Sequence, residues 1–286
     1  MKVTKAALPL LPLCQRLLPG RLAGLSLALL KATALEIAIL AGHLLLYPSG
    51  ITQERRSPLP APEDGAAQLP TQAKPPVVLL HGFIDNRSVF VLLRRSLAQH
   101  GRQQIESLNY SPLTCDVRSA AELLGRHIEE ICERTGNTRV DIVGHSLGGL
   151  IARYYVQRLG GDARVRTLVT LGTPHAGTRV VPLANAHPIV RQMRPGSELL
   201  EELARPAPGC RTHFVSFWSD LDHLMDPLET ACIDHADLEA ENVRVSGIGH
   251  LALPVHPAVA TGIRQVLDTA RAGEETAARA GGLTVA

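Results

Sequence analysis

The stretch VDIVGHSLGG, residues 140–149, decides the fold. An apolar run with the length of a buried strand breaks off into closely spaced glycines, and helical spacing of apolar residues follows from 147 to 158. Ser146 lies at the centre of Gly-His-Ser-Leu-Gly, a G-x-S-x-G pattern. Between a strand and a helix this pattern is typical of a strained turn that exposes a nucleophilic serine. The alternative is a glycine-rich turn that contains an incidental serine.

Apolar runs and helical patterns alternate on both sides of this stretch. Short apolar runs predict strands at 77–80, 104–108, 139–143, 165–171, 213–217 and 243–246. Helical spacing predicts helices at 88–100, 117–133, 147–158 and 257–271. Strands that alternate with helices are joined by crossover connections, so we expect an α/β fold with a mostly parallel sheet of about six strands and helices on both faces.

The composition changes divide the chain into four parts. Residues 1–56 form a hydrophobic N-terminal segment, and 57–74 are a proline-rich linker. The α/β domain is expected over 75–272, with a short, irregular cap region at 176–207. Residues 273–286 are rich in alanine and glycine and predict a flexible tail.

The N-terminal segment allows two interpretations. Residues 22–47 are apolar over about the length that crosses a bilayer, but Lys31 and Glu36 interrupt them. A charge at the membrane centre costs about 2.5–3.5 kcal/mol. A single span would place the catalytic domain outside the cytoplasm, because four basic residues (Lys2, Lys5, Arg16 and Arg21) precede the apolar run and two (Arg55 and Arg56) follow it closely. Otherwise the segment is a helix that packs on the domain or lies on a membrane surface. We therefore expect a membrane-anchored or secreted protein.

The bulk composition excludes several classes of protein. Lys and Arg number 29 against 27 Asp and Glu, which leaves a formal charge of +2 and no electrostatic footprint for nucleic acid. Aromatic residues make up only 3%, too few for a platform that stacks bases. The 5 cysteines are too scattered for a disulfide framework or a zinc site, although Cys210 and Cys232 flank one loop-rich region and are candidates for a pair.

Residues with reactive side chains follow the carboxyl ends of the predicted strands. In an open parallel sheet, functional residues lie beyond these ends. A serine, an acid and a histidine follow three strands in that order: Ser146, then Asp220 or Asp222, then His250. His250 is the expected general base for the serine. Position alone leaves the choice between the two aspartates open.

A developing oxyanion needs two backbone donors beside the serine. The loop after the first strand supplies one candidate, the N–H of Phe83, because Gly82 lets the backbone approach closely. The second candidate is the N–H of Leu147, at the start of the following helix.

Five segments together resemble the α/β-hydrolase superfamily, and within it bacterial triacylglycerol lipases and related esterases. They are VVLLHGF, VDIVGHSLGGLIARYY, VTLGTPHAGT, SDLDHLMDP and GIGHLALPVHPAV, and the likeness runs from about residue 75 to 270. In lipases of this type the acid lies in a Ser-x-x-Asp loop that ends near a proline, which favours Asp222. The short cap departs from lipases with a large lid, and no ligand cluster suggests the calcium site of some larger relatives.

The resemblance implies a carboxylic ester hydrolase that works without a cofactor or metal. The expected partner is a lipid-like acyl ester whose chain contacts Phe83, Ile84 and the cap. A thioesterase, acyltransferase, amidase or membrane-lipid deacylase that uses the same triad is the alternative. A second alternative is a non-catalytic, membrane-tethered binding protein of this fold.

Overall fold

The computed structural model describes residues 20–50, 74–83, 85–111, 116–180 and 187–281. The predicted linker up to residue 73, Ile84, Cys14 and Cys115 lie outside these ranges.

Six parallel strands form one sheet in the order β2-β1-β3-β4-β5-β6. Their bounds are β1 Val77–Leu80, β2 Ile105–Leu108, β3 Val140–His145, β4 Val165–Leu171, β5 His213–Ser219 and β6 Ala240–Val245. The expected α/β fold and strand number are confirmed. β6 begins three residues earlier than the apolar pattern predicts, because this edge strand is largely exposed and its first residues, Ala240 to Asn242, give no apolar run.

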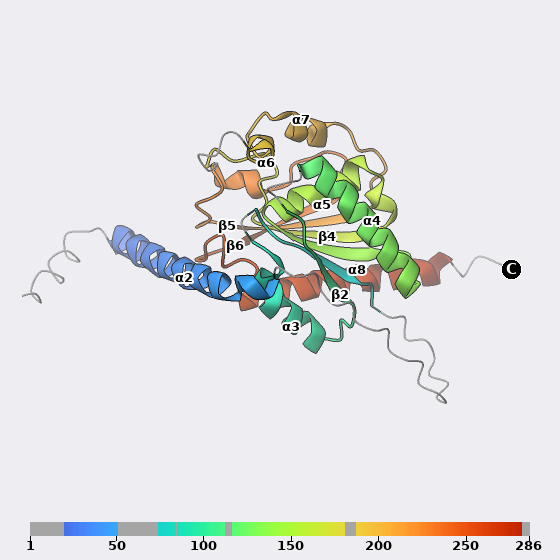
Figure 1. Ribbon diagram of the computed structural model, residues 1–286, viewed down its shortest axis with the longest axis horizontal. Helices are drawn as coiled ribbons and strands as arrows, with labels where there is room; N and C mark the ends of the chain where they lie inside the picture. Colours follow the sequence, from blue (N-terminus) through green and yellow to red (C-terminus); the bar gives the residue numbers. More distant parts are fainter. Residues whose placement is uncertain (1–19, 51–73, 84, 112–115, 181–186, 282–286) are drawn as a thin grey trace, which may run out of the picture.

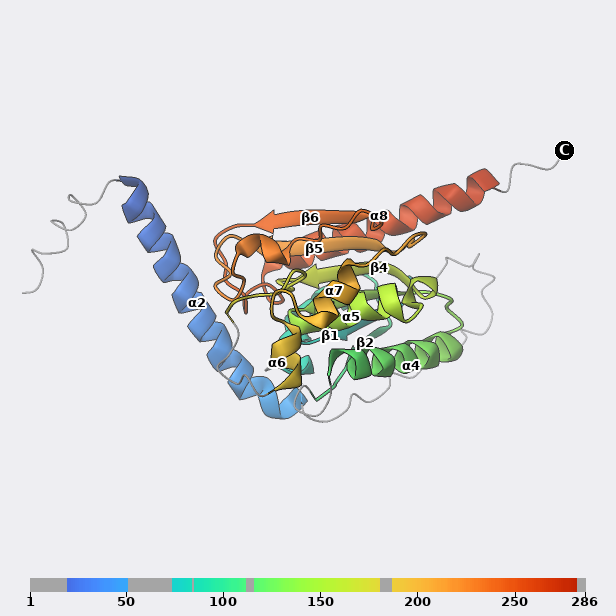
Figure 2. The same ribbon diagram turned by 90° about the horizontal axis from the view of Figure 1, so that it is seen from above.

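Helices cover both faces of the sheet (Figures 1 and 2). On one face α4 (Val117–Thr135) and α5 (Leu147–Arg158) bury residues such as Leu124 and Leu150 against Val78 and Ile142. On the other face α3 (Val91–Gln99) and α8 (Pro257–Gly281) form a second core with Leu79 and other alternate residues of the same strands. Successive strand residues point to opposite faces, so β1 is buried on both sides.

Two segments are more helical than the sequence patterns predict. The cap contains α6 (Pro188–Gln192) and α7 (Glu198–Ala204), where Ser197 caps α7 by accepting the N–H of Leu200. α7 is tied to α5 because Arg153 donates to the carbonyl of Leu203 (3.4 Å). α8 continues ten residues past the predicted end at Arg271, through a stretch of alanine, glutamate and arginine that favours helix.

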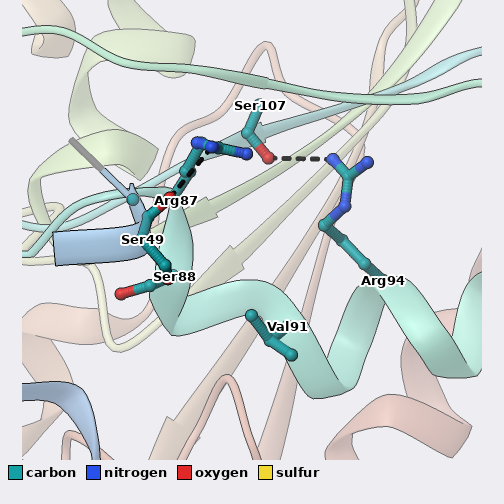
Figure 3. A pocket seen from close by; sticks show the side chains of 7 residues that line it. Ser49, Arg87, Ser88, Val91, Arg94 and Ser107 are labelled. Atoms are coloured by element: carbon teal, nitrogen blue, oxygen red, sulfur yellow. Dashed lines mark hydrogen bonds between the residues drawn. The ribbon is translucent and has the colours of Figure 1, made fainter. Parts of the chain in front are cut away.

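The N-terminal segment forms α2 (Gly20–Gly50), which lies against the domain. Figure 2 shows α2 beside the carboxyl ends of strands β4 and β6, where their arrowheads lie. Its last turn is fastened by side chains of the domain: Asn86 donates to the carbonyl of Tyr47 (2.9 Å), Asn109 to that of Gly50 (2.7 Å) and Arg87 to that of Ser49 (3.0 Å). A cavity of about 150 Å³ lies at this junction between α2 and α3 (Figure 3). None of the predicted catalytic residues lines it.

Candidate active site

Ser146 occupies a strained turn between β3 and α5. Its φ and ψ are 51° and −117°, and it has the one positive φ among the described non-glycine residues. Every residue from Val140 to Val156 is buried except Ser146, which is half-buried. The Ser146 side chain makes no capping hydrogen bond to α5. The turn therefore presents one accessible hydroxyl on an otherwise buried stretch, at a conformational cost of about 1–3 kcal/mol.

Close backbone packing explains the glycines around this serine. A Cβ at Gly144 would lie 2.6 Å from the amide nitrogen of Gly149, and one at Gly148 would lie 2.3 Å from the carbonyl oxygen of Leu80. Real Cβ atoms do not approach backbone atoms so closely, so a side chain at either position would force the turn or β1 to move. Backbone crowding thus requires residues without a side chain on both sides of Ser146.

Asp222 and His250 form a buried pair. The loop after β5 carries Asp222 and the loop after β6 carries His250, with side chains 1% and 5% exposed. Their Oδ2 and Nδ1 atoms are 2.7 Å apart. An ionised carboxylate can only accept, so this hydrogen bond places the proton on Nδ1 and leaves Nε2 of the neutral ring as the basic nitrogen.

The two candidate aspartates have different partners. Asp220 accepts from Arg244 of β6 (2.9 Å) and from the N–H of Gly247 (3.1 Å) on the exposed side of the loop. Asp222 alone meets the histidine. The structure thus brings together the aspartate that the family resemblance favours and the predicted base.

The histidine–aspartate pair lies beside the serine turn. His145, directly before Ser146, has its Nε2 3.2 Å from the carbonyl oxygen of His250, and the two imidazole centroids are 4.8 Å apart. Gly172 follows β4 with φ 53°, and a Cβ there would lie 2.9 Å from Asp222 Oδ2 and 3.0 Å from His250 Nδ1. The lack of a side chain at Gly172 therefore leaves room for the pair. The glycine at a strand end in LGTP is the sequence signal for this role.

Burial and charge act in opposite directions on His250. Burial by itself would lower its pKa. The charge and hydrogen bond of Asp222 raise the pKa, and the charges of Asp85 and Glu36 raise it further. The net result is a pKa of His250 above its ordinary value. A raised pKa suits a base that must hold a proton on an imidazolium during part of a reaction.

The loop after β1 lies next to Ser146, as predicted for an oxyanion loop. A Cβ at Gly82 would be 3.4 Å from the Cβ of Ser146. Tyr110 holds this loop: its ring stacks on His81 at a centroid distance of 4.3 Å and its hydroxyl donates to the His81 carbonyl. The half-buried ring of Phe83 meets His187 of the cap edge-on, with centroids 5.6 Å apart.

Three further candidates, a cysteine pair, a metal cluster and a second histidine, do not add to this site. Cys210 and Cys232 are both free thiols, so the pairing considered from the sequence is not formed. Among the described residues, no three histidine, cysteine or acidic side chains are grouped so as to hold a metal ion. His175, another histidine at a strand end, is buried and bonds with Thr170 (2.9 Å) instead.

Residues 76–230 match the family model described as palmitoyl protein thioesterase. The chain belongs to this family. The match includes the β1 loop, Ser146 and Asp222 and ends before His250.

Curated relatives are triacylglycerol lipases. That of Burkholderia plantarii is 29% identical over 126 residues, which cover 41% of this chain and 34% of the relative. That of Pseudarthrobacter phenanthrenivorans is 30% identical over 111 residues, covering 36% and 34%. This chain thus spans about a third of the length of these relatives.

Solved structures share the architecture. A Bacillus licheniformis lipase in its mature form superposes with a TM-score of 0.59 at 16% identity, over 76% of this chain and 96% of the lipase. A monoacylglycerol lipase from Paleococcus ferrophilus has a TM-score of 0.51 at 13% identity, over 68% and 95%. At these identities the likeness shows the α/β-hydrolase fold alone.

Proposed function

We propose that this chain is a serine hydrolase that cleaves carboxylic esters of lipid-like acyl groups. The observation that carries the proposal is the accessible, strained Ser146 beside the buried Asp222–His250 pair. Burying a charged group costs free energy unless the group is paired, and a buried pair next to the half-buried Ser146 can serve to activate its hydroxyl. The lipase relatives support an ester as the substrate.

The reaction follows from the roles assigned to these groups. Ser146 Oγ attacks the acyl carbonyl while His250 Nε2 takes its proton, and Asp222 stabilises the imidazolium that forms. The N–H groups of Phe83 and Leu147 donate to the oxyanion. The tetrahedral intermediate collapses when His250 returns the proton to the leaving oxygen. Water, activated by the same histidine, then releases the carboxylic acid and restores Ser146. None of these steps uses a cofactor.

A thioester is the second candidate substrate, and the family match favours it. The same steps apply with a thiol as the leaving group. Parallel assays of p-nitrophenyl palmitate and palmitoyl-CoA distinguish the two, because the preferred bond gives the larger kcat/KM. An acyltransferase would instead form an acylated acceptor, and only when an alcohol or amine is added to the assay.

Ser146→Ala tests the whole assignment. We expect kcat to fall on the order of 10⁵- to 10⁶-fold, because the covalent route is lost. A fluorophosphonate probe should label the wild-type chain and not the variant. Equal labelling of both chains would remove Ser146 as the nucleophile.

We also propose that α2 attaches the enzyme to a lipid surface. Residues Leu29–Gly50 are long and apolar enough to cross a membrane, with a mean hydropathy of 1.7. Ala32 is buried, however, and Glu36 and residues 47–50 bond to the domain, so residues 20–31 are the part that extends beyond these contacts, about 18 Å of helix against a hydrocarbon core of about 30 Å. The docked helix therefore fits a surface position better than a span. The domain's location outside the cytoplasm stays a prediction from the basic residues.

Flotation with liposomes tests this attachment. The full chain should float with the vesicles, and replacing exposed Leu40 and Leu44 by Gln should reduce the floated fraction. A wild-type chain that stays with the soluble protein would contradict attachment by α2.

A further inference from the structure

Glu36 and His43 of α2 lie on the face that contacts the domain. Ala32, Glu36, Ile39 and His43 are spaced by four, three and four residues and so share one side of the helix. Ala32 and His43 are buried, and Ile39 packs on the core beneath α3 and α8. The other sides carry exposed apolar residues: Leu27, Leu29, Leu30, Leu35, Ile37, Leu40, Leu44, Leu45 and Leu46. Of the two charges that weaken α2 as a membrane span, Glu36 is thus directed at the hydrolase domain, whereas Lys31 is exposed.

Glu36 contacts the loop that carries His250. Its Oε2 accepts the N–H of Leu251 and its Oε1 accepts the N–H of Ala252, each at 2.9 Å. A Cβ on Gly249 would lie 2.5 Å from the same carboxyl group. The carboxylate therefore lies across residues 249–252 and holds both amides that follow His250. Hydrogen bonds to a carboxylate are about twice as strong as neutral ones, so this contact fixes the loop firmly.

A second residue of α2, His43, lies near the polar groups beside His250. His43 Nδ1 is 3.7 Å from Asp85 Oδ1, and Asp85 Oδ2 is 3.5 Å from His145 Nδ1. His145 in turn meets the carbonyl of His250 at 3.2 Å. Glu36 thus holds the two backbone amides that follow His250, and the carbonyl of His250 lies against His145.

We propose that Glu36 is a positioning residue for the hydrolytic reaction, so that the His250 loop has its working geometry only while α2 is docked. The inference rests on the proposed function, in which His250 is the base. It makes the N-terminal helix a component of the active site as well as a lipid anchor. Four charged or titratable groups then surround His250 from different elements: Asp222, Asp85, His145 and Glu36.

The isosteric variant Glu36→Gln tests the proposal in the full chain in detergent. With p-nitrophenyl butyrate, whose short acyl chain makes a lipid surface unnecessary, we expect kcat/KM to fall about 10- to 100-fold, mostly through kcat. The acidic limb of the pH profile should move to lower pH, since the charge of Glu36 helps to keep His250 protonated.

Lys31→Gln is the matched control, because it removes a charge from an exposed position on the same helix. It should keep the wild-type rate and pH profile, and equal Tm values for the three proteins would show that they are equally folded. Wild-type kinetics in Glu36→Gln, an unmoved acidic limb, or the same loss in Lys31→Gln would each overturn the inference. A wild-type chain without activity would instead contradict the proposed function.

Discussion

Two buried carboxylates at opposite ends of the same sheet are used differently. Asp141, the second residue of β3, lies at the amino-terminal edge and accepts from Arg166 (2.9 and 2.6 Å) and Arg102 (3.0 Å). Asp222, beyond the carboxyl edge, accepts from one titratable partner, His250 (2.7 Å). Both aspartates are almost fully buried, at 0% and 1% exposed.

The difference lies in what each partner can do. Arginine binds carboxylates through a rigid fork of donors, so the Asp141 cluster fixes structure. An imidazole gains and loses a proton near neutral pH, so the charge of Asp222 acts on a group that can work as a base. We therefore expect substitutions at Asp141 to affect stability and substitutions at Asp222 to affect rate.

The largest effect is expected at the carboxyl edge. Asp222→Asn should lower kcat about 10⁴-fold, because the amide no longer fixes the tautomer of His250 or stabilises its imidazolium. Asp220→Asn is the matched control, since Asp220 pairs with exposed Arg244, and its kcat should stay near the wild-type value. Ester hydrolysis by both variants decides the point, and a larger loss in Asp220→Asn would reverse the assignment of the acid.

At the amino edge the expected effect is on folding. Asp141→Asn removes the buried carboxylate that Arg166 and Arg102 share, while Arg102 keeps its contact with Asp268 (3.3 Å), and should lower the free energy of unfolding by about 3–5 kcal/mol. Below its unfolding transition the variant should keep kcat within a few-fold of the wild type. Urea unfolding and hydrolysis assays measure the two quantities. A variant with normal stability and lost activity would end the contrast between the two edges.

The smallest expected effect is a pH dependence in which stability and activity change in opposite directions. Because the folded pKa of His250 is raised, its contribution to stability is complete below the unfolded pKa of about 6.5 and is lost as pH rises through the folded pKa. Activity should increase over the same range, since the base must be neutral to accept the proton of Ser146.

The difference in Tm between wild type and His250→Asn isolates the contribution of His250 to the pH dependence of stability. Burial lowers the pKa of His175 well below its ordinary value and gives the opposite slope, but His175 is present in both chains and cancels. We expect the wild-type advantage in Tm to shrink from pH 6 to 9 while wild-type kcat/KM rises. An advantage that grows with pH would show that the pKa of His250 is not raised.

Local sequence patterns were sufficient for most of the fold. Strands buried on both faces are short apolar runs, and helices that cover a sheet repeat every three to four residues, so β1, β3, β4, α4 and α5 were predictable from neighbours in sequence. The exposed edge strand β6 and the short cap helices α6 and α7 follow weaker patterns, because few of their residues enter the core by a regular period.

The candidate site shows the same division. The strand, glycines and helix around Ser146 are contiguous, so the sequence alone indicated its turn. The choice between Asp220 and Asp222 depended on Arg244 and His250, which follow 24 and 28 residues later and approach only when β6 pairs with β5. The family resemblance favoured Asp222, and the contacts of the two side chains explain why it did.

Sequence by itself determined the α/β class, the serine turn and the order of the three site residues, because each depends on backbone preferences and apolar periodicity over short stretches. Tertiary structure decided which aspartate meets His250 and what Glu36 does. In sequence Glu36 is a costly charge in an apolar helix, 215 residues from Leu251. In the fold its half-buried carboxylate is hydrogen-bonded to the His250 loop, since a charge that leaves water is stable only where folding brings distant donors to it.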